Sequence, residues 1–328
     1  MNEWANRVFN IHNEKDFHFI ALGLFDFQFT HNPLYQDYCR AVRRTPDTIK
    51  RVEDIPFLPI SFFKSHRIVT TAFDPALIFQ SSGTTGNTTS SHFVKAAALY
   101  EQSFTEGFRL FYGDIRDYCL LGLLPSYLER GQSSLVYMVD RLIKQSGHPE
   151  SGFYLHDLDR LDETLTRLEA TGQKTLLIGV TYALLDFAAK YPRQLRHTLV
   201  METGGMKGRR RELTRAELHE ELSRQLGLTS VHAEYGMTEL LSQAYAINGH
   251  FRTPPWMRIC LRDETDPFTI LPNQPGLSGA INVIDLANIY SCSFIATEDV
   301  GRWLPENQFE VLGRMDHTDV RGCSMIAD

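Results

Sequence analysis

The sequence predicts an α/β fold with mainly parallel sheets flanked by helices, followed by a smaller β-rich subdomain. Over the first two thirds of its 328 residues, short apolar runs rich in β-forming residues alternate with longer segments at helical period. This alternation is typical of βα units and a parallel sheet. After Asn248, prolines interrupt short strand-like runs and helical period is lost. We therefore expect an α/β core with a helical lead-in over residues 1–245 and a β-rich subdomain over 246–328.

Each expected element has its own signal. Residues 1–70 are rich in aromatic side chains and are expected to form the helical lead-in. Apolar runs bounded by turn residues predict strands at 76–80, 118–124, 175–180, 198–202 and 230–235. Helical period predicts helices at 94–111, 133–146, 158–171, 181–190 and 214–226. The last of these begins at Thr214 with Glu217 three residues later, which is the pattern of a capping box.

Composition and charge exclude several classes of protein. No apolar run approaches the ~18 residues that span a bilayer, and the polar, acidic start does not resemble a signal peptide. The net charge is −7, so a nucleic-acid-binding face is not expected. The basic cluster Arg209, Arg210 and Arg211 is either an ordinary solvated turn or a site for a phosphopantetheine or for the acidic face of a carrier protein. We expect a cytoplasmic protein with no membrane insertion and no nucleic-acid partner.

The five cysteines are an odd number, lie far apart and include no CxxC pair. This pattern favours free thiols over a disulfide framework or a structural zinc site. Cys39, Cys119, Cys260 and Cys292 lie in or beside apolar runs and are expected in the core. Cys323 lies near the end of the sequence, two residues after Arg321 and away from such runs.

The stretch SSGTTGNTTSSH (81–92) follows the first expected strand. A glycine loop between a strand and a helix directs backbone N–H groups, hydroxyls and the helix N-terminus at one point, which favours phosphate binding. The stretch matches neither the Walker A loop nor GxGxxG, so neither a P-loop NTPase nor a dinucleotide fold follows. The residues alone leave open a phosphate site or a mobile Ser/Thr/Gly turn.

SSGTTG resembles the phosphate-loop motif of the adenylate-forming superfamily, which includes acyl-CoA synthetases, firefly luciferase and peptide-synthetase adenylation domains. Four further motifs of that superfamily follow in order. The resemblance implies the fold of its N-terminal domain and implies ATP and Mg²⁺ as cofactors, with coenzyme A as a further candidate. The matching residues are Ser81, Ser82, Gly83, Thr84, Thr85 and Gly86 in the loop, Gly204-Gly205, Tyr235-Gly236-Met237-Thr238-Glu239, Asp299, and Gly313-Arg314-Met315-Asp316.

The resemblance also implies a role for each motif. Thr84 and Thr85 lie where the family stabilises transition-state charge, and Ser81, Ser82, Gly83 and Gly86 complete that phosphate loop. Gly204, Gly205 and Tyr235 lie against adenine, Thr238 touches the α-phosphate and Glu239 binds Mg²⁺. Gly236 belongs to the same motif, and Asp299 and Arg314 hold the ribose. On their own, Gly204-Gly205 is compatible with an ordinary turn and Glu239 with a solvated helix residue.

The sequence departs from the family pattern at two places. The phosphate loop lacks the usual Pro-Lys and has Asn87-Thr88, and the sequence ends about a dozen residues after Arg314. We therefore expect no C-terminal lid domain and no lysine from such a domain.

LLPSYLERGQSSLVYMVDRL (123–142) and LGRMDHTDVRGCSMIAD (312–328) resemble the acyl-protein synthetase of bacterial bioluminescence fatty-acid reductases. In that family a near-terminal cysteine takes the acyl group as a thioester and passes it to a partner reductase. The matching residue is Cys323.

Three functions remain open from the sequence. The first is adenylation of a carboxylic acid, with a fatty acid as the first candidate, and transfer of the acyl group through Cys323 to a protein partner or another thiol. The second is direct transfer to coenzyme A or a carrier protein, and the third is a non-catalytic nucleotide-binding subunit. His232 and His317 are each a candidate base or a surface imidazole, and the candidate walls of the acid pocket are Tyr127, Gln132 and Val180.

Overall fold

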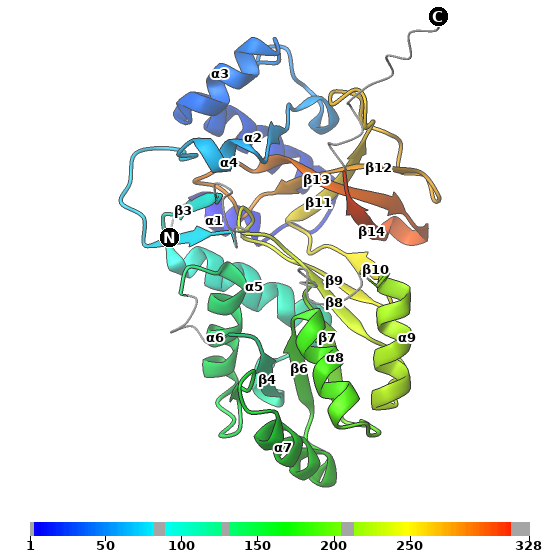
Figure 1. Ribbon diagram of the computed structural model, residues 1–328. Helices are drawn as coiled ribbons and strands as arrows, with labels where there is room; N and C mark the ends of the chain where they lie inside the picture. Colours follow the sequence, from blue (N-terminus) through cyan, green and yellow to red (C-terminus); the bar gives the residue numbers. More distant parts are fainter. Residues whose placement is uncertain (1–2, 82–88, 126–130, 205–212, 316–328) are drawn as a thin grey trace, which may run out of the picture.

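The computed structural model describes residues 3–81, 89–125, 131–204 and 213–315 (Figure 1). The N-terminal helices and the last strands form the upper part of the molecule in Figure 1, and the parallel strands with their helices form the lower part. The α-helices are α1 Glu3–Val8, α2 Glu14–His31, α3 Pro33–Ala41, α4 Phe62–Ser65, α5 Ala97–Tyr112, α6 Ser134–Ser146, α7 Leu158–Thr171, α8 Thr181–Lys190 and α9 Arg215–Leu226. Short 3₁₀ turns cover Val52–Asp54, Ile115–Asp117 and Pro305–Asn307.

The strands of the described ranges form one large sheet and one hairpin. The large sheet has the order β11-β12-β13-β14-β10-β9-β8-β7-β6-β4-β5, with β1 beside β13. The strands are β1 Leu58–Pro59, β2 Leu77–Gln80, β3 Ser91–Val94, β4 Cys119–Leu123, β5 Gly152–Phe153, β6 Thr175–Gly179, β7 Thr198–Glu202, β8 His232–Tyr235, β9 Ala244–Ile247, β10 His250–Arg252, β11 Met257–Arg262, β12 Ser278–Asp285, β13 Phe294–Trp303 and β14 Phe309–Arg314.

The parallel half of the sheet runs from β5 through β4, β6 and β7 to β8. Strands β4 and β6 are buried at every residue, because helices cover both of their faces. Leu120 and Leu176 pack on the side of α5 and α6, whereas Leu121 and Leu177 pack on the side of α7, α8 and α9. Strands buried on both faces read as continuous apolar runs, and this explains why the sequence pattern located them.

The other half of the sheet is antiparallel and runs from β9 through β10, β14, β13 and β12 to β11. It joins the parallel half where β8 pairs antiparallel with β9. The predicted α/β class is confirmed, although the parallel strands form only one half of the large sheet. Residue 245 lies within β9, and the hydrogen bonds of the sheet continue from β8 through β9 to β10. The expected division into an α/β core and a β-rich subdomain at this residue stays a prediction.

Helices α1 to α4 lie within the expected lead-in of residues 1–70, together with a 3₁₀ turn and β1, and this segment packs on the antiparallel half of the sheet. The Gln28 side chain on α2 donates to the backbone oxygens of Asn288 and Ile289, each at 3.0 Å, and its own oxygen accepts from Ser293 N–H at 2.9 Å. The rings of Phe25 and Phe294 meet edge to face at 6.2 Å. Residues from the two ends of the described chain therefore share one core.

The predicted helices α6, α7, α8 and α9 agree with the structure within one residue at each end. Thr214 and Glu217 form the predicted capping box at the start of α9. The prediction is wrong after the phosphate loop, because β3 follows the loop and α5 begins only at Ala97. His92 and Val94 point inward and Ser91 and Phe93 outward, which is the period of a strand. The loop therefore connects the two strands of a hairpin, and no helix N-terminus follows it directly.

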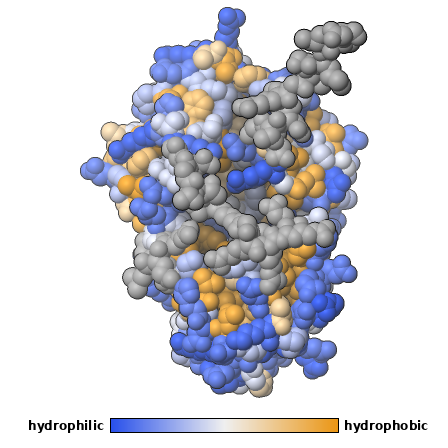
Figure 2. Space-filling view, viewed as in Figure 1, coloured by the Kyte–Doolittle hydropathy of each residue, from blue (hydrophilic) through white to orange (hydrophobic). Residues whose placement is uncertain are grey.

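Within the described ranges, no helix is both long and apolar enough to cross a membrane. The lower end of the molecule, where α7 lies, is covered by hydrophilic side chains (Figure 2).

Cys39, Cys119, Cys260 and Cys292 are buried and unpaired, as predicted. Burial raises the pKa of each of these thiols, so none of the four is an activated nucleophile.

Candidate active site

Three of the predicted nucleotide-binding residues meet where β8, β13 and β14 lie close together. The Tyr235 hydroxyl donates to Asp299 Oδ2 at 2.8 Å. Arg314 Nε lies 3.4 Å from Asp299 Oδ1, and the two residues face each other in the register of β13 and β14. The Tyr235 ring is held by contacts with the rings of Phe251 and Phe309. Residues from three strands, separated by up to 79 positions in the sequence, thus form one cluster.

The electrostatics of this cluster leave Asp299 available as an acceptor. Burial raises the pKa of Asp299, and the Tyr235 hydrogen bond and the Arg314 charge counteract that rise. Burial and the neighbouring Asp299 carboxylate raise the pKa of Tyr235 well above its usual value, so Tyr235 keeps its proton. The Arg314 side chain is 81% exposed and Asp299 only 13%, which leaves the guanidinium in solvent. A pair of this kind, anchored on one side and open on the other, suits the two hydroxyls of a ribose.

The Thr238–Glu239 turn is fixed by two buried residues that the sequence did not single out. His92 Nδ1 on β3 lies 2.8 Å from the Thr238 carbonyl oxygen, and Nε2 lies 3.0 Å from Oδ1 of Asn288. The Asn288 amide donates to the Glu239 carbonyl oxygen at 2.8 Å. Burial lowers the pKa of His92 to about 4, so the imidazole is neutral at pH 7. The strand leaving the phosphate loop is thus tied to the backbone of the candidate metal ligand.

The Glu239 side chain is only 5% exposed and accepts a hydrogen bond from Ser90. Burial raises the pKa of its carboxyl, and the Ser90 bond and the charges of Arg314 and Lys64 counteract that rise. No group of three or more metal-ligating side chains occurs among the described residues. A single carboxylate fits Mg²⁺ that is held mainly by substrate phosphates, because Mg²⁺ keeps several water or phosphate ligands. Glu239 is therefore suited to a metal that arrives with a nucleotide.

The base of the phosphate loop is closed by Ser81 and Ser90. Ser81 N–H donates to the Ser90 carbonyl oxygen at 3.1 Å, and Ser90 N–H donates to the Ser81 hydroxyl at 2.9 Å. Since Ser90 also reaches Glu239, the loop base lies next to the candidate metal ligand. The other predicted loop residues, Ser82, Gly83, Thr84, Thr85 and Gly86, lie outside the described residues, as do Asn87 and Thr88.

The predicted adenine turn begins at Gly204, whose φ of +73° is a conformation that favours glycine. The Glu202 carboxylate accepts from Gly204 N–H at 2.7 Å and from Arg215 Nε at 3.1 Å. Arg215 also donates to the Val311 carbonyl oxygen on β14 at 3.2 Å. The turn after β7 is therefore connected to the strand that carries Arg314. Gly205 lies outside the described residues.

Gly236 and His232 lie outside the cluster formed by Tyr235, Asp299 and Arg314. A Cβ on Gly236 would lie 2.4 Å from Glu234 Oε1, so glycine leaves room for that carboxyl. His232 is buried with Nδ1 3.2 Å from the Tyr112 hydroxyl, and burial lowers its pKa. The interpretation of His232 as a surface imidazole is wrong. It lies on the opposite face of β8 from Tyr235, because side chains alternate along a strand.

Several predicted residues remain untested. Cys323, Arg321, His317 and Asp316 lie outside the described residues, as do Arg209, Arg210, Arg211 and Tyr127. The Gln132 carbonyl oxygen accepts from Gln80 N–H at 2.8 Å, and Val180 precedes α8. Their part in an acid pocket stays a prediction.

The raised pKa of the buried Glu234 carboxyl can be tested through the pH dependence of stability. Burial, followed by the negative charge of Glu202, raises the pKa of Glu234 to about 8. The folded protein therefore binds one more proton than the unfolded chain between about pH 4.5 and pH 8, and stability falls as pH rises through this window. We expect Glu234→Gln to remove this slope, worth at most about 1.4 kcal/mol per pH unit, and to stabilise the protein at pH 8. Urea unfolding at pH 5, 6.5 and 8 measures it; equal slopes in both proteins would contradict the raised pKa.

The comparisons with known proteins agree with the motifs and the fold. No family model matches the sequence. The long-chain-fatty-acid–luciferin-component ligase of Vibrio harveyi is 23% identical over 337 residues, covering 93% of this chain and 85% of that protein. A solved 2-hydroxyisobutyryl-CoA ligase, in the postadenylation state with R3-HIB-AMP, has a TM-score of 0.64 at 11% identity and covers 95% of this chain.

A second solved structure, ATP-bound MatB from Rhodopseudomonas palustris, has a TM-score of 0.54 at 17% identity and covers 86% of this chain. This chain spans 58% of the length of that structure and 70% of the length of the 2-hydroxyisobutyryl-CoA ligase. The predicted fold, that of the N-terminal domain of adenylate-forming enzymes, is confirmed by these structures. The predicted resemblance to the adenylate-forming superfamily is therefore present in the fold as well as in the motifs.

Proposed function

We propose that this protein is an ATP-dependent ligase that activates a carboxylic acid, with a fatty acid as the first candidate, as its acyl-adenylate. The observation that carries the proposal is the cluster of Tyr235, Asp299 and Arg314 beside the Thr238–Glu239 turn and the closed base of the phosphate loop. In this arrangement the proposed ribose site at Asp299 and Arg314 comes first, the proposed metal ligand Glu239 second, and the base of the phosphate loop third. Such an order suits a nucleotide that lies across the cluster to which β8, β13 and β14 contribute Tyr235, Asp299 and Arg314.

The first chemical step would join the acid to AMP. A carboxylate oxygen of the acid attacks the α-phosphorus of ATP, the bond to the β-phosphate oxygen breaks, and pyrophosphate leaves. Mg²⁺, when bound, supplies neutralisation of phosphate charge, and Glu239 would be its protein ligand. Asp299 and Arg314 would hold the ribose so that the α-phosphorus stays in line with the acid, which is a positioning effect.

The second step would move the acyl group to sulfur. The Cys323 thiolate attacks the carbonyl carbon of the acyl-adenylate, a thioester forms and AMP leaves, while the thiol proton passes to solvent. A nucleophile of a protein partner then attacks the thioester carbonyl carbon and takes the acyl group, and the Cys323 thiolate is released. The 23% identical ligase from Vibrio harveyi supports a fatty acid as substrate, because its name gives a long-chain fatty acid and a luciferin component.

The test is the intact mass of the protein after incubation with Mg²⁺-ATP and a panel of fatty and aromatic acids, before and after neutral hydroxylamine. We expect an added mass equal to one acyl group, which hydroxylamine removes and which is absent from Cys323→Ala. Cys260→Ala is the matched control, because this thiol is buried and its pKa is raised to about 12. The control should keep the acyl group.

The other outcomes separate the competing functions. Pyrophosphate release without an added mass would favour direct transfer to coenzyme A or a carrier protein. ATP binding with neither signal would favour a non-catalytic nucleotide-binding subunit. An acyl group that remains in Cys323→Ala would contradict the proposed acceptor.

A further inference from the structure

Helix α4 places a lysine beside the candidate active site. The chain enters α4 from β1, which pairs with β13, and Ile60 N–H donates to the Ala296 carbonyl oxygen at 2.9 Å. On the other side, the buried Phe63 ring meets the His92 ring edge to face at 5.9 Å. Because His92 contacts the Thr238 carbonyl oxygen, α4 is one side chain away from the Thr238–Glu239 turn. Lys64 follows Phe63 and is exposed.

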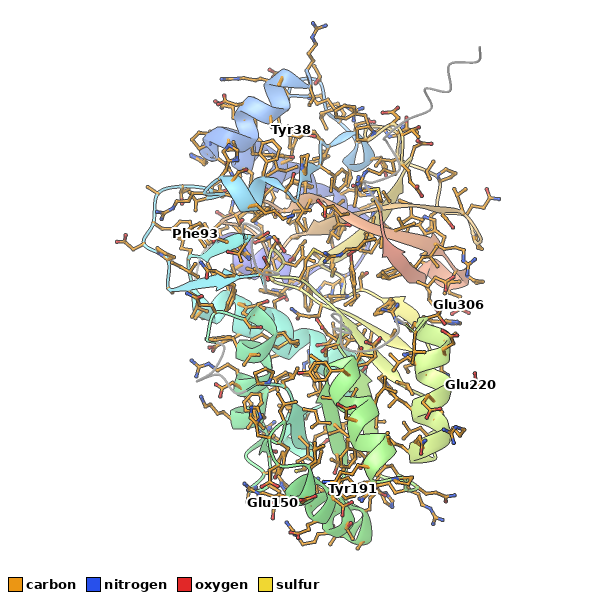
Figure 3. The ribbon with its side chains drawn as sticks, in the orientation of Figure 1. Tyr38, Phe93, Glu150, Tyr191, Glu220 and Glu306 are labelled. Carbon is orange, nitrogen blue, oxygen red and sulfur yellow. The ribbon has the colours of Figure 1, made fainter. Side chains whose placement is uncertain are left out.

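The neighbouring cations already have partners, which distinguishes Lys64. The Arg67 guanidinium lies over the Phe93 ring at 4.8 Å, and Phe93 is labelled on the hairpin in Figure 3. The Lys95 ammonium lies 4.1 Å from the centre of the Tyr290 ring. Across the described residues, the Lys64 ammonium takes part in no ion pair or hydrogen bond. Burial raises the pKa of Glu239, and the charges of Arg314 and Lys64 are among the causes that oppose this rise.

The two cations that act on Glu239 come from different directions. Arg314 belongs to β14 and is paired with Asp299, at the end of the site that suits a ribose. Lys64 comes from α4, which packs against β3 at the strand that leaves the phosphate loop. A polyphosphate beside the buried carboxyls of Glu239 and Asp299 needs positive charge to offset the repulsion. A lysine ammonium can supply it, because it binds phosphate oxygens as a point charge. Since Phe63 packs on His92 beside the loop base, the neighbouring Lys64 is on the side of the site where a nucleotide would carry the phosphates beyond its ribose.

We propose that Lys64 is a nucleotide-binding residue whose ammonium binds the β- and γ-phosphate oxygens of ATP next to Glu239. This inference rests on the proposed function, because it needs an ATP site at the cluster of Tyr235, Asp299 and Arg314. It adds the N-terminal segment to the nucleotide site. It also gives α4 a role in distinguishing ATP from AMP, since AMP has neither of the phosphates that Lys64 would bind.

The test is the affinity of Mg²⁺-ATP and of AMP, measured by calorimetric titration in the absence of any acid. We expect Lys64→Ala to weaken ATP binding on the order of tenfold or more, as for the loss of one charge-assisted hydrogen bond. AMP affinity should change by less than about twofold, because a one-phosphate ligand does not reach the ammonium. Lys64→Arg keeps the charge and should lose less ATP affinity than Lys64→Ala. Lys50→Ala is the matched control, since its exposed ammonium contacts only the Pro46 carbonyl oxygen at 3.1 Å.

Each result decides between the claims. An unchanged ATP affinity in Lys64→Ala would overturn the inference and leave the proposed function intact. An equal loss of ATP and AMP affinity would also overturn it, because Lys64 would then support the fold of the site and not bind the outer phosphates. A wild-type protein that binds neither nucleotide would overturn the proposed function together with the inference.

Discussion

Replacing Glu239 by glutamine is expected to lower the rate of acyl-adenylate formation by at least about a hundredfold, because glutamine keeps the shape but removes the charge that would hold Mg²⁺. Glu239 is buried, with 5% of the residue exposed. The measurement is acid-dependent exchange of labelled pyrophosphate into ATP. Exchange should fall while the melting temperature stays the same or rises, because a buried carboxyl costs folding energy.

The control for this prediction is Glu220→Gln on α9, an exposed residue labelled at the right of Figure 3. It removes the same charge from the surface and should leave exchange unchanged. If Glu239→Gln kept full exchange at saturating Mg²⁺, Glu239 would not be the metal ligand, and the ribose cluster alone would support nucleotide binding.

Replacing Asp285 by alanine is expected to lower the free energy of unfolding on the order of 3 kcal/mol or more, the largest stability effect that we predict for a single polar residue. Asp285 is fully buried at the end of β12. Its Oδ2 accepts from the N–H groups of Leu241 and Ser242 at 2.7 and 3.0 Å. Its Oδ1 accepts from the Ser242 hydroxyl at 2.6 Å and from Ala287 N–H at 3.1 Å. Alanine would leave these donors buried without acceptors.

Asparagine should not restore the stability lost on removing Asp285. Each carboxylate oxygen accepts from at least one backbone N–H, so the asparagine NH₂ group would face a donor in either orientation. Asp47→Ala, an exposed aspartate, is the control and should change stability by less than about 0.5 kcal/mol. Urea unfolding followed by circular dichroism measures all three variants. A mild effect of Asp285→Asn would mean that the loop after Glu239 is held by other contacts.

The sequence predicted best those elements whose residues are buried in a regular pattern. Strands β4 and β6 are apolar on both faces, and α7 and α9 begin at side chains that cap them, so local signals were sufficient. Strand β3 was missed because SHFV follows a run of small hydroxyl residues and is only four residues long. Its pairing partner, β2, is eleven or more residues away in sequence, and only the hairpin shows that the loop ends in a strand.

The candidate site divides in the same way. Tyr235, Asp299 and Arg314 were predicted from motifs, and the structure brings them together. His92, Asn288 and Asp285 were not predicted, because each acts through a contact with a residue more than 40 positions away. A histidine on a strand or an aspartate at a strand end carries no local signal for such a contact. Long-range hydrogen bonds to backbone groups cannot be derived from composition or period.

The packing of the lead-in helices against the last strands sets an order of events during synthesis. Helix α2 leaves the ribosome early, but the groups that Gln28 binds, at residues 288, 289 and 293, are made about 260 positions later. Strand β1 likewise waits for its partner β13. The apolar face of α2 therefore stays without its native cover until residues 288–293 have been made. Such non-local pairing slows folding and exposes the nascent chain to aggregation. A holdase chaperone present during synthesis should therefore raise the soluble yield more than a substitution that only slows unfolding of the folded protein.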